Sequence, residues 1–113
     1  MNLAEIAEHL DLRVYSGRGR LERAVDAGYT GDLLSDVIAH AHKDALWITI
    51  QVHPNIIAVA VLKELSAILL VNGREPAPET AARAEKENIP VLGTPLSAFD
   101  IAGRLRELGI RGA

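Results

Sequence analysis

Apolar and polar residues succeed one another along the chain in blocks that predict alternating strands and helices. Three nearly continuous apolar blocks have the length of buried strands, and they cover residues 45–50, 67–71 and 89–93. Each block is followed by a segment whose apolar positions repeat with helical spacing, over residues 54–65, 78–88 and 95–109. Apolar strands that are each followed by a helix are typical of a parallel sheet with helices on both faces. The pattern therefore predicts an α/β fold with three consecutive β-α units in a mostly parallel sheet.

The residues before these units show a less regular pattern. Residues 2–10 predict an amphipathic helix with Asn2 as its N-cap, because their apolar positions are spaced i, i+3, i+4 and i+7. Residues 12–17 have the composition of a short strand, and the alternation over residues 24–29 suggests a second strand. We therefore expect an N-terminal helix and one or two short extra strands.

A further helix is expected before the first regular strand. Residues 33–41 place apolar side chains at helical spacing. Asp32 or Ser35 is expected to cap the first turn of this helix. The positive charge of His42 and Lys43 favours an end of the helix near these residues.

Length and charge limit the class of protein. The 113 residues contain no linker or repeat, so we expect one domain over residues 1–113. The 12 basic and 15 acidic residues give a formal charge of −3, which argues against nucleic acid as the main partner. The arginines between residues 13 and 23 are expected to form a solvated face.

Cysteine is absent, which excludes disulfides, thiolate nucleophiles and Cys-ligated metal sites and fits a reducing compartment. The N-terminus has acidic residues where a signal peptide has basic ones. The longest apolar run, residues 56–62, is far shorter than the roughly 20 residues that span a bilayer. We therefore predict a cytoplasmic protein that does not cross a membrane.

The sequence lacks the motifs of several enzyme classes. It contains no G-x-x-x-x-G-K-[ST] phosphate loop, no G-x-G-x-x-G after a strand and no G-x-S-x-G. His40 and His42 diverge by about 200° on a helix, so they do not form a helical metal pair. Asp36 and His40 have i, i+4 spacing, for which a solvated cluster at a helix end is the favoured interpretation. We expect neither a cofactor nor a metal.

The loops that follow the three regular strands are the best candidates for ligand binding. Ligands of parallel α/β sheets bind beyond the carboxyl ends of the strands, where helix N-termini present free N–H groups. The candidate residues in these loops are Gln51, His53, Asn55, Asn72, Gly73, Arg74, Thr94 and Ser97.

Two features of these loops favour an anionic ligand, although a purely structural interpretation stays open. Gly73 and Gly93 would let an anion approach the backbone. Arg74 can form a fork with a phosphate or carboxylate, or it can pair with Glu75 or with a neighbouring subunit. Three of the candidates are also ordinary capping residues, namely Asn55, Thr94 and Ser97.

Much of the sequence resembles a known family. The stretches "DLLSDV", "LWITIQVHPNIIAVAVLKEL", "AILLVNGREP" and "IPVLGTPLSAFDIAGRL" are similar to the DRTGG domain family, and especially to its small stand-alone members. His53 and Pro54 stand where the family has its Asp-Arg pair, and residues 72–74 stand where it has Thr-Gly-Gly. Residues 94–99 match the family well. The resemblance implies a fold similar to that of the N-terminal domain of HPr kinase/phosphorylase.

The resemblance also implies a regulatory role. Members of the family occur as modules in phosphotransacetylases and, between CBS domains, in pyrophosphatases that respond to adenine nucleotides. Stand-alone members tend to be encoded beside iron-only hydrogenase and related redox genes. This implies a partner protein in a hydrogenase-type redox complex.

Two functional hypotheses follow from these observations. The first is a non-catalytic regulatory or interaction module that binds a small anion or a nucleotide at the carboxyl edge of the sheet. It is expected to form a homodimer, because residues 56–65 are apolar on almost all sides of the predicted helix. The alternative is a small enzyme that acts on a phosphorylated substrate with His53 as acid/base. The alternative requires a carboxylate or hydroxyl within hydrogen-bond reach of His53.

Overall fold

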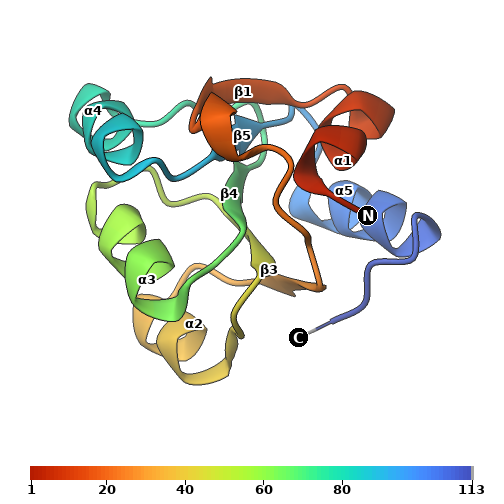
Figure 1. Ribbon diagram of the computed structural model, residues 1–113. Coiled ribbons are helices and arrows are strands. Elements are labelled where there is room, and N and C mark those ends of the chain that lie inside the picture. The colour runs from red at the N-terminus through yellow and green to blue at the C-terminus, as the bar shows by residue number, and fades with distance from the viewer. Residues whose placement is uncertain (113) are drawn as a thin grey trace.

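The computed structural model describes residues 1–112 as a sheet between two layers of helices (Figure 1). The helices are α1 (Leu3–Leu10), α2 (Leu34–His40), α3 (Asn55–Lys63), α4 (Pro78–Glu87) and α5 (Ala98–Glu107). The strands are β1 (Arg13–Ser16), β2 (Ala27–Thr30), β3 (Ala45–Thr49), β4 (Ala67–Leu70) and β5 (Val91–Gly93), and a 3-10 turn covers Arg18–Arg20.

The sheet has the strand order β1-β5-β4-β3-β2. Strands β2 to β5 are parallel, and each consecutive pair is joined through a helix. Strand β1 is antiparallel to β5, with Arg13 opposite Gly93. The predicted α/β fold, with three β-α units and extra strands near the N-terminus, is thus confirmed.

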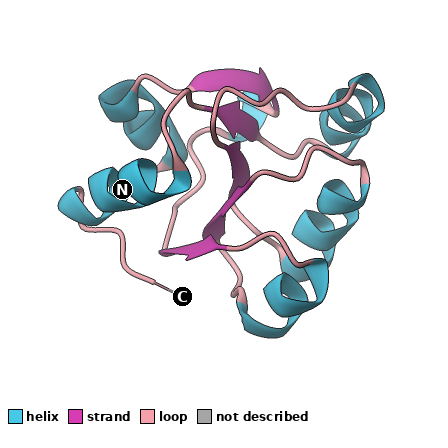
Figure 2. Ribbon diagram, turned by 180° about the vertical axis from the view of Figure 1, so that it is seen from behind, coloured by secondary structure: helices cyan, strands magenta, loops and turns pink. Residues whose placement is uncertain are grey.

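Each face of the sheet has its own apolar core. The cores alternate along β3, where Trp47 belongs to one core and Leu46 and Ile48 belong to the other. Helices α2, α3 and α4 cover the Trp47 face, and α1 and α5 cover the opposite face. Figure 2 shows the strands in magenta between these two groups of helices. A strand that is buried on both faces needs no polar alternation, which explains the continuous apolar runs.

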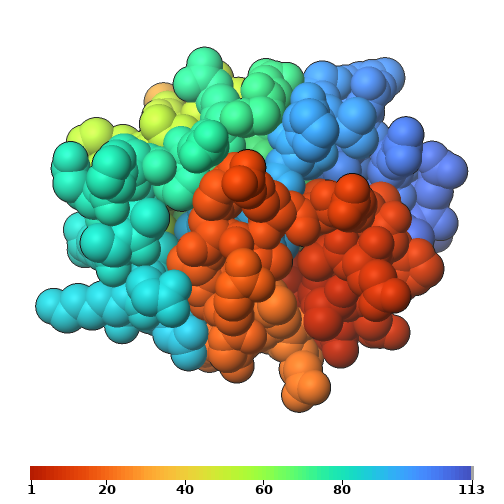
Figure 3. Space-filling model, turned by 90° about the horizontal axis from the view of Figure 1, so that it is seen from above, coloured from red at the N-terminus to blue at the C-terminus, as the bar shows by residue number. Residues whose placement is uncertain are grey.

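Helix α1 begins as its sequence predicts. Asn2 is the N-cap, and its Oδ1 accepts a hydrogen bond from the Glu5 backbone N–H over 2.8 Å. The Glu5 carboxylate accepts one from the Asn2 backbone N–H over 2.9 Å, which completes a capping box. Seen from above, the N-terminal residues lie between α4, in cyan, and α5, in blue (Figure 3).

Helix α2 differs from the prediction at its beginning. Leu33 occupies the N-cap position and makes no side-chain capping bond, so neither Asp32 nor Ser35 caps this helix. The helix ends at His40, near His42 and Lys43 as predicted, because the chain turns into an extended conformation at the C-cap. The carboxylate of Asp32 has other hydrogen-bond donors, which lie in the candidate site.

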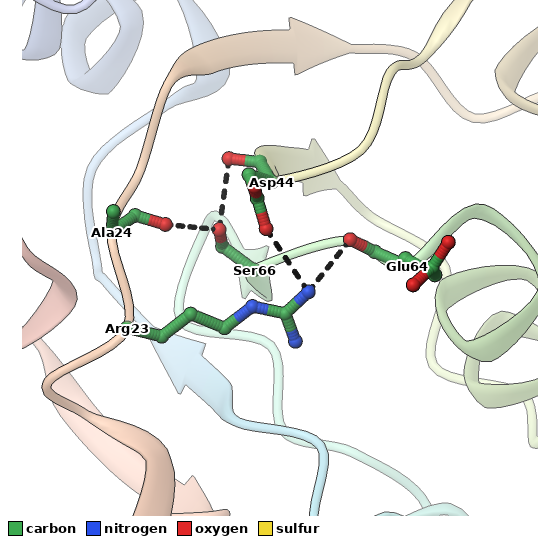
Figure 4. Close-up of polar contacts among 5 residues, drawn as sticks. All are labelled: Arg23, Ala24, Asp44, Glu64 and Ser66. Carbon is green, nitrogen blue, oxygen red and sulfur yellow. Dashed lines mark hydrogen bonds and ion pairs between the residues drawn. The ribbon is translucent and has the colours of Figure 1, made fainter.

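Polar contacts fasten the segment before β2 to the amino ends of β3 and β4 (Figure 4). Ser66 Oγ lies 2.6 Å from the carbonyl oxygen of Ala24 and 2.8 Å from that of Asp44. The Arg23 guanidinium donates to Asp44 Oδ1 over 3.2 Å and to the Glu64 carbonyl oxygen over 2.8 Å. Arg23 therefore has a structural role at the amino edge of the sheet, and its prediction as part of a solvated face is wrong.

No helix in the described part of the chain is long and apolar enough to cross a membrane.

Candidate functional site

The carboxyl edge of the sheet is assembled from four loops and the beginning of β1. Strands β2, β3, β4 and β5 are parallel, so the loops after them meet at one edge. Strand β1 runs in the opposite direction, and its first residue, Arg13, pairs with the last residue of β5, Gly93. The beginning of β1 therefore contributes side chains to an edge that otherwise consists of loops.

Asp32 connects the loops after β2 and β3. Its Oδ1 accepts hydrogen bonds from Thr49 Oγ1 over 2.8 Å and from the Ile50 backbone N–H over 2.9 Å. Its backbone carbonyl accepts one from Gln51 Nε2 over 2.9 Å. Gln51, a predicted ligand contact, thus already has a protein partner. No local pattern in the sequence indicates this connection, because it joins residues 17 to 19 positions apart through tertiary contacts.

His53 is exposed beyond β3 and lacks the environment of a general acid or base. Its Nδ1 accepts a hydrogen bond from the Asn55 backbone N–H over 3.1 Å. Among residues 1–112, no carboxylate or hydroxyl lies within hydrogen-bond reach of its ring. Asn55 is the first residue of α3 and does not cap the helix, because Pro54 occupies the N-cap position. The structure therefore does not meet the condition that the enzymatic hypothesis sets.

The loops after β4 and β5 bind to each other through their backbones. The Asn72 N–H donates to the Leu96 carbonyl and the Gly73 N–H donates to the Thr94 carbonyl, each over 2.9 Å. Thr94 Oγ1 accepts from the Leu96 N–H over 3.2 Å. Ser97 caps α5 as one of its two interpretations predicts, accepting from the N–H of residue 100 over 3.2 Å. The N–H groups of Asn72 and Gly73 are therefore not free to bind an anion.

A cavity of about 260 Å³ opens between these two loops and β1. Its lining consists of Asp11, Arg13, Tyr15, Gly73, Glu75, Gly93, Thr94 and Pro95. Two of the predicted site residues, Gly73 and Thr94, belong to this lining. The other six lie outside it. They are Gln51, His53, Asn55, Asn72, Arg74 and Ser97.

Arg13 and Tyr15 form the β1 side of the cavity. The Arg13 guanidinium carbon lies 5.6 Å from the centroid of the Tyr15 ring, at the distance of a cation–π contact. The Tyr15 ring covers Gly93 so closely that a Cβ atom at this position would lie 2.7 Å from Tyr15 Cε2. Gly93 is therefore needed to accommodate the Tyr15 ring, a role that the sequence did not predict.

The charges around the cavity are of both signs and are not neutralised by one another. Asp11 and Glu75 contribute carboxylates, and Arg13 contributes a guanidinium. None of these three side chains belongs to an ion pair within residues 1–112. Arg74 is exposed and likewise forms no ion pair with its neighbour Glu75. The cavity can thus offer hydrogen-bond acceptors and a cation to the same ligand.

Asp36 and His40 form part of a surface network that also includes Tyr29. The Tyr29 hydroxyl donates to one oxygen of the Asp36 carboxylate, and His40 Nδ1 lies 3.1 Å from the other. The bond from Tyr29 holds the pKa of Asp36 below its usual value, and the same bond raises the pKa of Tyr29. Among residues 1–112, no three His, Asp or Glu side chains are grouped so that they could hold a metal ion.

We expect the substitution Tyr29→Phe to raise the pKa of Asp36, because the carboxylate loses its main hydrogen-bond donor. The lowered folded-state pKa of Asp36 stabilises the wild-type domain above about pH 4, and this contribution is lost as the pH falls through that lowered value. The raised pKa of Tyr29 stabilises the domain below about pH 10, and this contribution to stability is lost as the pH rises through the raised value.

An NMR titration of the side-chain carboxyl carbons measures the pKa of Asp36 directly. The substitution Tyr15→Phe is the matched control, because it removes a tyrosine hydroxyl that makes no contact with Asp36. An unchanged Asp36 pKa in Tyr29→Phe would contradict the assignment.

Known proteins share this architecture. A similar fold occurs in the structure of the CBS and DRTGG domains of the regulatory region of Clostridium perfringens pyrophosphatase, which is in complex with the activator diadenosine tetraphosphate. The match has a TM-score of 0.73 and 18% sequence identity, and covers 89% of this chain but only 44% of that chain. No curated protein matches the sequence significantly. The DRTGG domain family matches residues 5–108. The chain therefore belongs to the DRTGG domain family.

Proposed function

We propose that the domain is a non-catalytic regulatory module that binds a nucleotide in the carboxyl-edge cavity. The observation on which the proposal depends is that one cavity combines an aromatic ring, a guanidinium and two carboxylates. The fold is shared with a pyrophosphatase regulatory region whose activator is diadenosine tetraphosphate. This likeness supports a regulatory role, and the chemistry of the cavity supports the choice of ligand.

A nucleotide matches the cavity better than an inorganic anion does. The exocyclic amine of adenine and the ribose hydroxyls are hydrogen-bond donors, which suit the carboxylates of Asp11 and Glu75. The base can stack on Tyr15, as bases do on aromatic side chains. The phosphate can pair with Arg13. Arg74 directly follows Gly73, which lines the cavity, and can add a second cation. A small inorganic anion has no hydrogen-bond donor for these carboxylates, and their negative charge would repel it.

The size of the cavity limits how much of the ligand is enclosed. Its volume of about 260 Å³ lies below the roughly 300 Å³ at which small-molecule sites begin. We therefore expect the base and ribose to occupy the cavity while the phosphates stay at its rim. Of the predicted contacts outside the lining, the exposed side chains of His53 and Arg74 would then act on the exposed part of the ligand.

Calorimetric titration with diadenosine tetraphosphate and with inorganic tripolyphosphate tests this proposal. We expect only the nucleotide to bind appreciably, and Arg13→Gln to weaken its binding by roughly ten-fold or more, since charge-assisted hydrogen bonds contribute about 1.5–3 kcal/mol. Arg83→Gln is the matched control, because Arg83 is exposed on α4 and lies outside the cavity. No binding of the nucleotide at millimolar concentration, or equal binding by the Arg13 variant, would refute the proposal.

We also propose that the domain forms a homodimer through the outer face of α2 and α3. Helix α3 buries Ile56 and Ile57 against the sheet but leaves Val61 44% and Leu62 65% exposed. Ile38 on α2 is 38% exposed. Light scattering of the wild type and of Leu62→Glu tests this, because a charge at the interface should produce a monomer. A wild-type monomer at high concentration would contradict the dimer.

The association with a hydrogenase-type redox complex, which the family resemblance implies, stays a separate prediction. Affinity capture from the native host tests it, with Leu62→Glu as a variant that separates dimerisation from partner binding. Recovery of the domain without any redox protein would contradict this prediction and would leave the nucleotide proposal untouched.

A further inference from the structure

A second cavity lies between strand β2 and helix α5. Strand β2 is the outermost strand on the side of the sheet opposite β1. Its volume is about 290 Å³. Ile48, Leu105 and Ile110 provide apolar walls, and all three belong to the core on this face. Arg106 and Arg111 also line it, and both are exposed. None of these residues belongs to the carboxyl-edge cavity.

The chain after α5 forms one side of this second cavity. It turns at Gly109, whose φ of +95° is in the region that favours glycine, and then runs along the outside of β2. The Gly28 N–H donates to the Arg111 carbonyl over 2.7 Å, and Gly28 and Gly112 form a parallel bridge. Backbone hydrogen bonds therefore hold Arg111 beside the apolar walls, which are rigid because they are part of the core.

The guanidinium groups of the two arginines have no carboxylate partner in the described structure. Neither Arg106 nor Arg111 takes part in an ion pair within residues 1–112. Two guanidinium groups beside one apolar cavity repel each other, and an anion placed between them would relieve this repulsion. The apolar walls add a preference for a ligand whose body is hydrophobic.

We propose that this cavity binds a small organic acid with an apolar body, such as an aromatic carboxylate. The body would replace water against Ile48, Leu105 and Ile110, and the carboxylate would accept hydrogen bonds from Arg106 and Arg111. This site is independent of the nucleotide site, since it lies beside β2, whereas the nucleotide site lies beside β1 on the other side of the sheet, and the two share no side chain.

Amide NMR titration of the full chain with three probes tests the inference. The probes are 2-naphthoate, its neutral analogue 2-naphthylmethanol, and acetate, which has the charge without the apolar body. We expect 2-naphthoate to bind roughly ten-fold or more tightly than either of the others, because charged hydrogen bonds and apolar burial act together only in this probe. The amides of Gly28, Ala102 and Gly112 should shift.

Three variants locate the site. The double substitution Arg106→Gln and Arg111→Gln should weaken 2-naphthoate by roughly ten-fold or more and leave 2-naphthylmethanol unchanged. Ala102→Phe should fill the cavity and abolish the binding of both. Arg104→Gln is the matched control, because Arg104 is exposed on α5 but does not line the cavity.

Several results would overturn the inference. Equal affinity for 2-naphthoate and 2-naphthylmethanol would show that the arginines do not recognise the carboxylate. Equal affinity for acetate would show that the apolar walls have no role. An absence of shifts with all three probes would show that no such site exists. The arginine variant alters exposed side chains only, so it keeps the test valid even if Ala102→Phe fails to fold.

Discussion

Gly17→Ala is expected to destabilise the domain by about 2–4 kcal/mol. Gly17 has a φ of +73°, which costs a non-glycine residue about 1 kcal/mol. A Cβ atom there would also lie 2.4 Å from the Pro90 nitrogen and 2.6 Å from the Ile89 carbonyl carbon. These are backbone atoms at the entrance to β5, so the clash can be relieved only by moving β1 away from the strand it pairs with, and overpacking of this kind costs about 1–3 kcal/mol.

Gly73→Ala is the matched control for this substitution. Gly73 has nearly the same backbone conformation, with a φ of +70°, but no atom lies within 4 Å of the position that its Cβ would occupy. Its cost should therefore be the backbone term alone, about 1 kcal/mol. Urea denaturation followed by the fluorescence of Trp47 gives both values. Equal destabilisation by the two substitutions would contradict the close packing of Gly17 against Pro90.

The regular half of the fold was predictable because burial on both faces of a strand leaves a local signature. Residues 45–50 and 67–71 are apolar without alternation, and the helices after them have their own spacing. The position of β1 had no such signature. Its pairing with β5 joins residues 80 positions apart, such as Arg13 and Gly93, and depends on a glycine that makes room for Tyr15. The N-terminal strands could therefore be predicted as elements but not placed in the sheet.

The same limit explains the candidate site. The general rule that ligands bind beyond the carboxyl ends of parallel strands led to Gly73 and Thr94, which the structure places in the lining of the cavity. It could not lead to Arg13 or Tyr15, because these residues lie at the beginning of a strand, and only an antiparallel neighbour brings that end to the carboxyl edge. Nor could it reveal that Asp32 binds the backbone after β3 instead of capping α2.

Trp47→Ala is also expected to have a large effect, a loss of about 3–5 kcal/mol in the free energy of unfolding. The Trp47 side chain is fully buried in the core beneath α2 and α3. Removing it leaves a cavity that the sheet cannot close, and domains of this size are stable by only about 5–15 kcal/mol. Phe99→Ala is the matched control, because Phe99 is 88% exposed and its loss should change stability by about 0.5 kcal/mol or less.

Circular dichroism measures these stabilities, since Trp47 is the only tryptophan. Similar losses in both variants would contradict the burial of Trp47. The milder Trp47→Phe keeps one aromatic ring in the core and removes the hydrogen bond that Trp47 Nε1 donates to the Gly31 carbonyl over 2.8 Å. We expect this variant to lose about 1–3 kcal/mol.

Trp47→Phe also tests whether the core positions the candidate site. Gly31 precedes Asp32, whose carboxylate accepts the Ile50 N–H at the beginning of the loop that contains His53. Without its bond to Trp47, Gly31 should move more freely, and Asp32 with it. Hydrogen exchange of the Ile50 amide should therefore accelerate in Trp47→Phe by more than that of amides within β4, which are held by strand pairing alone. Uniform acceleration would show that the variant lowers only global stability, and that the indole N–H does not fix the loops of the carboxyl edge.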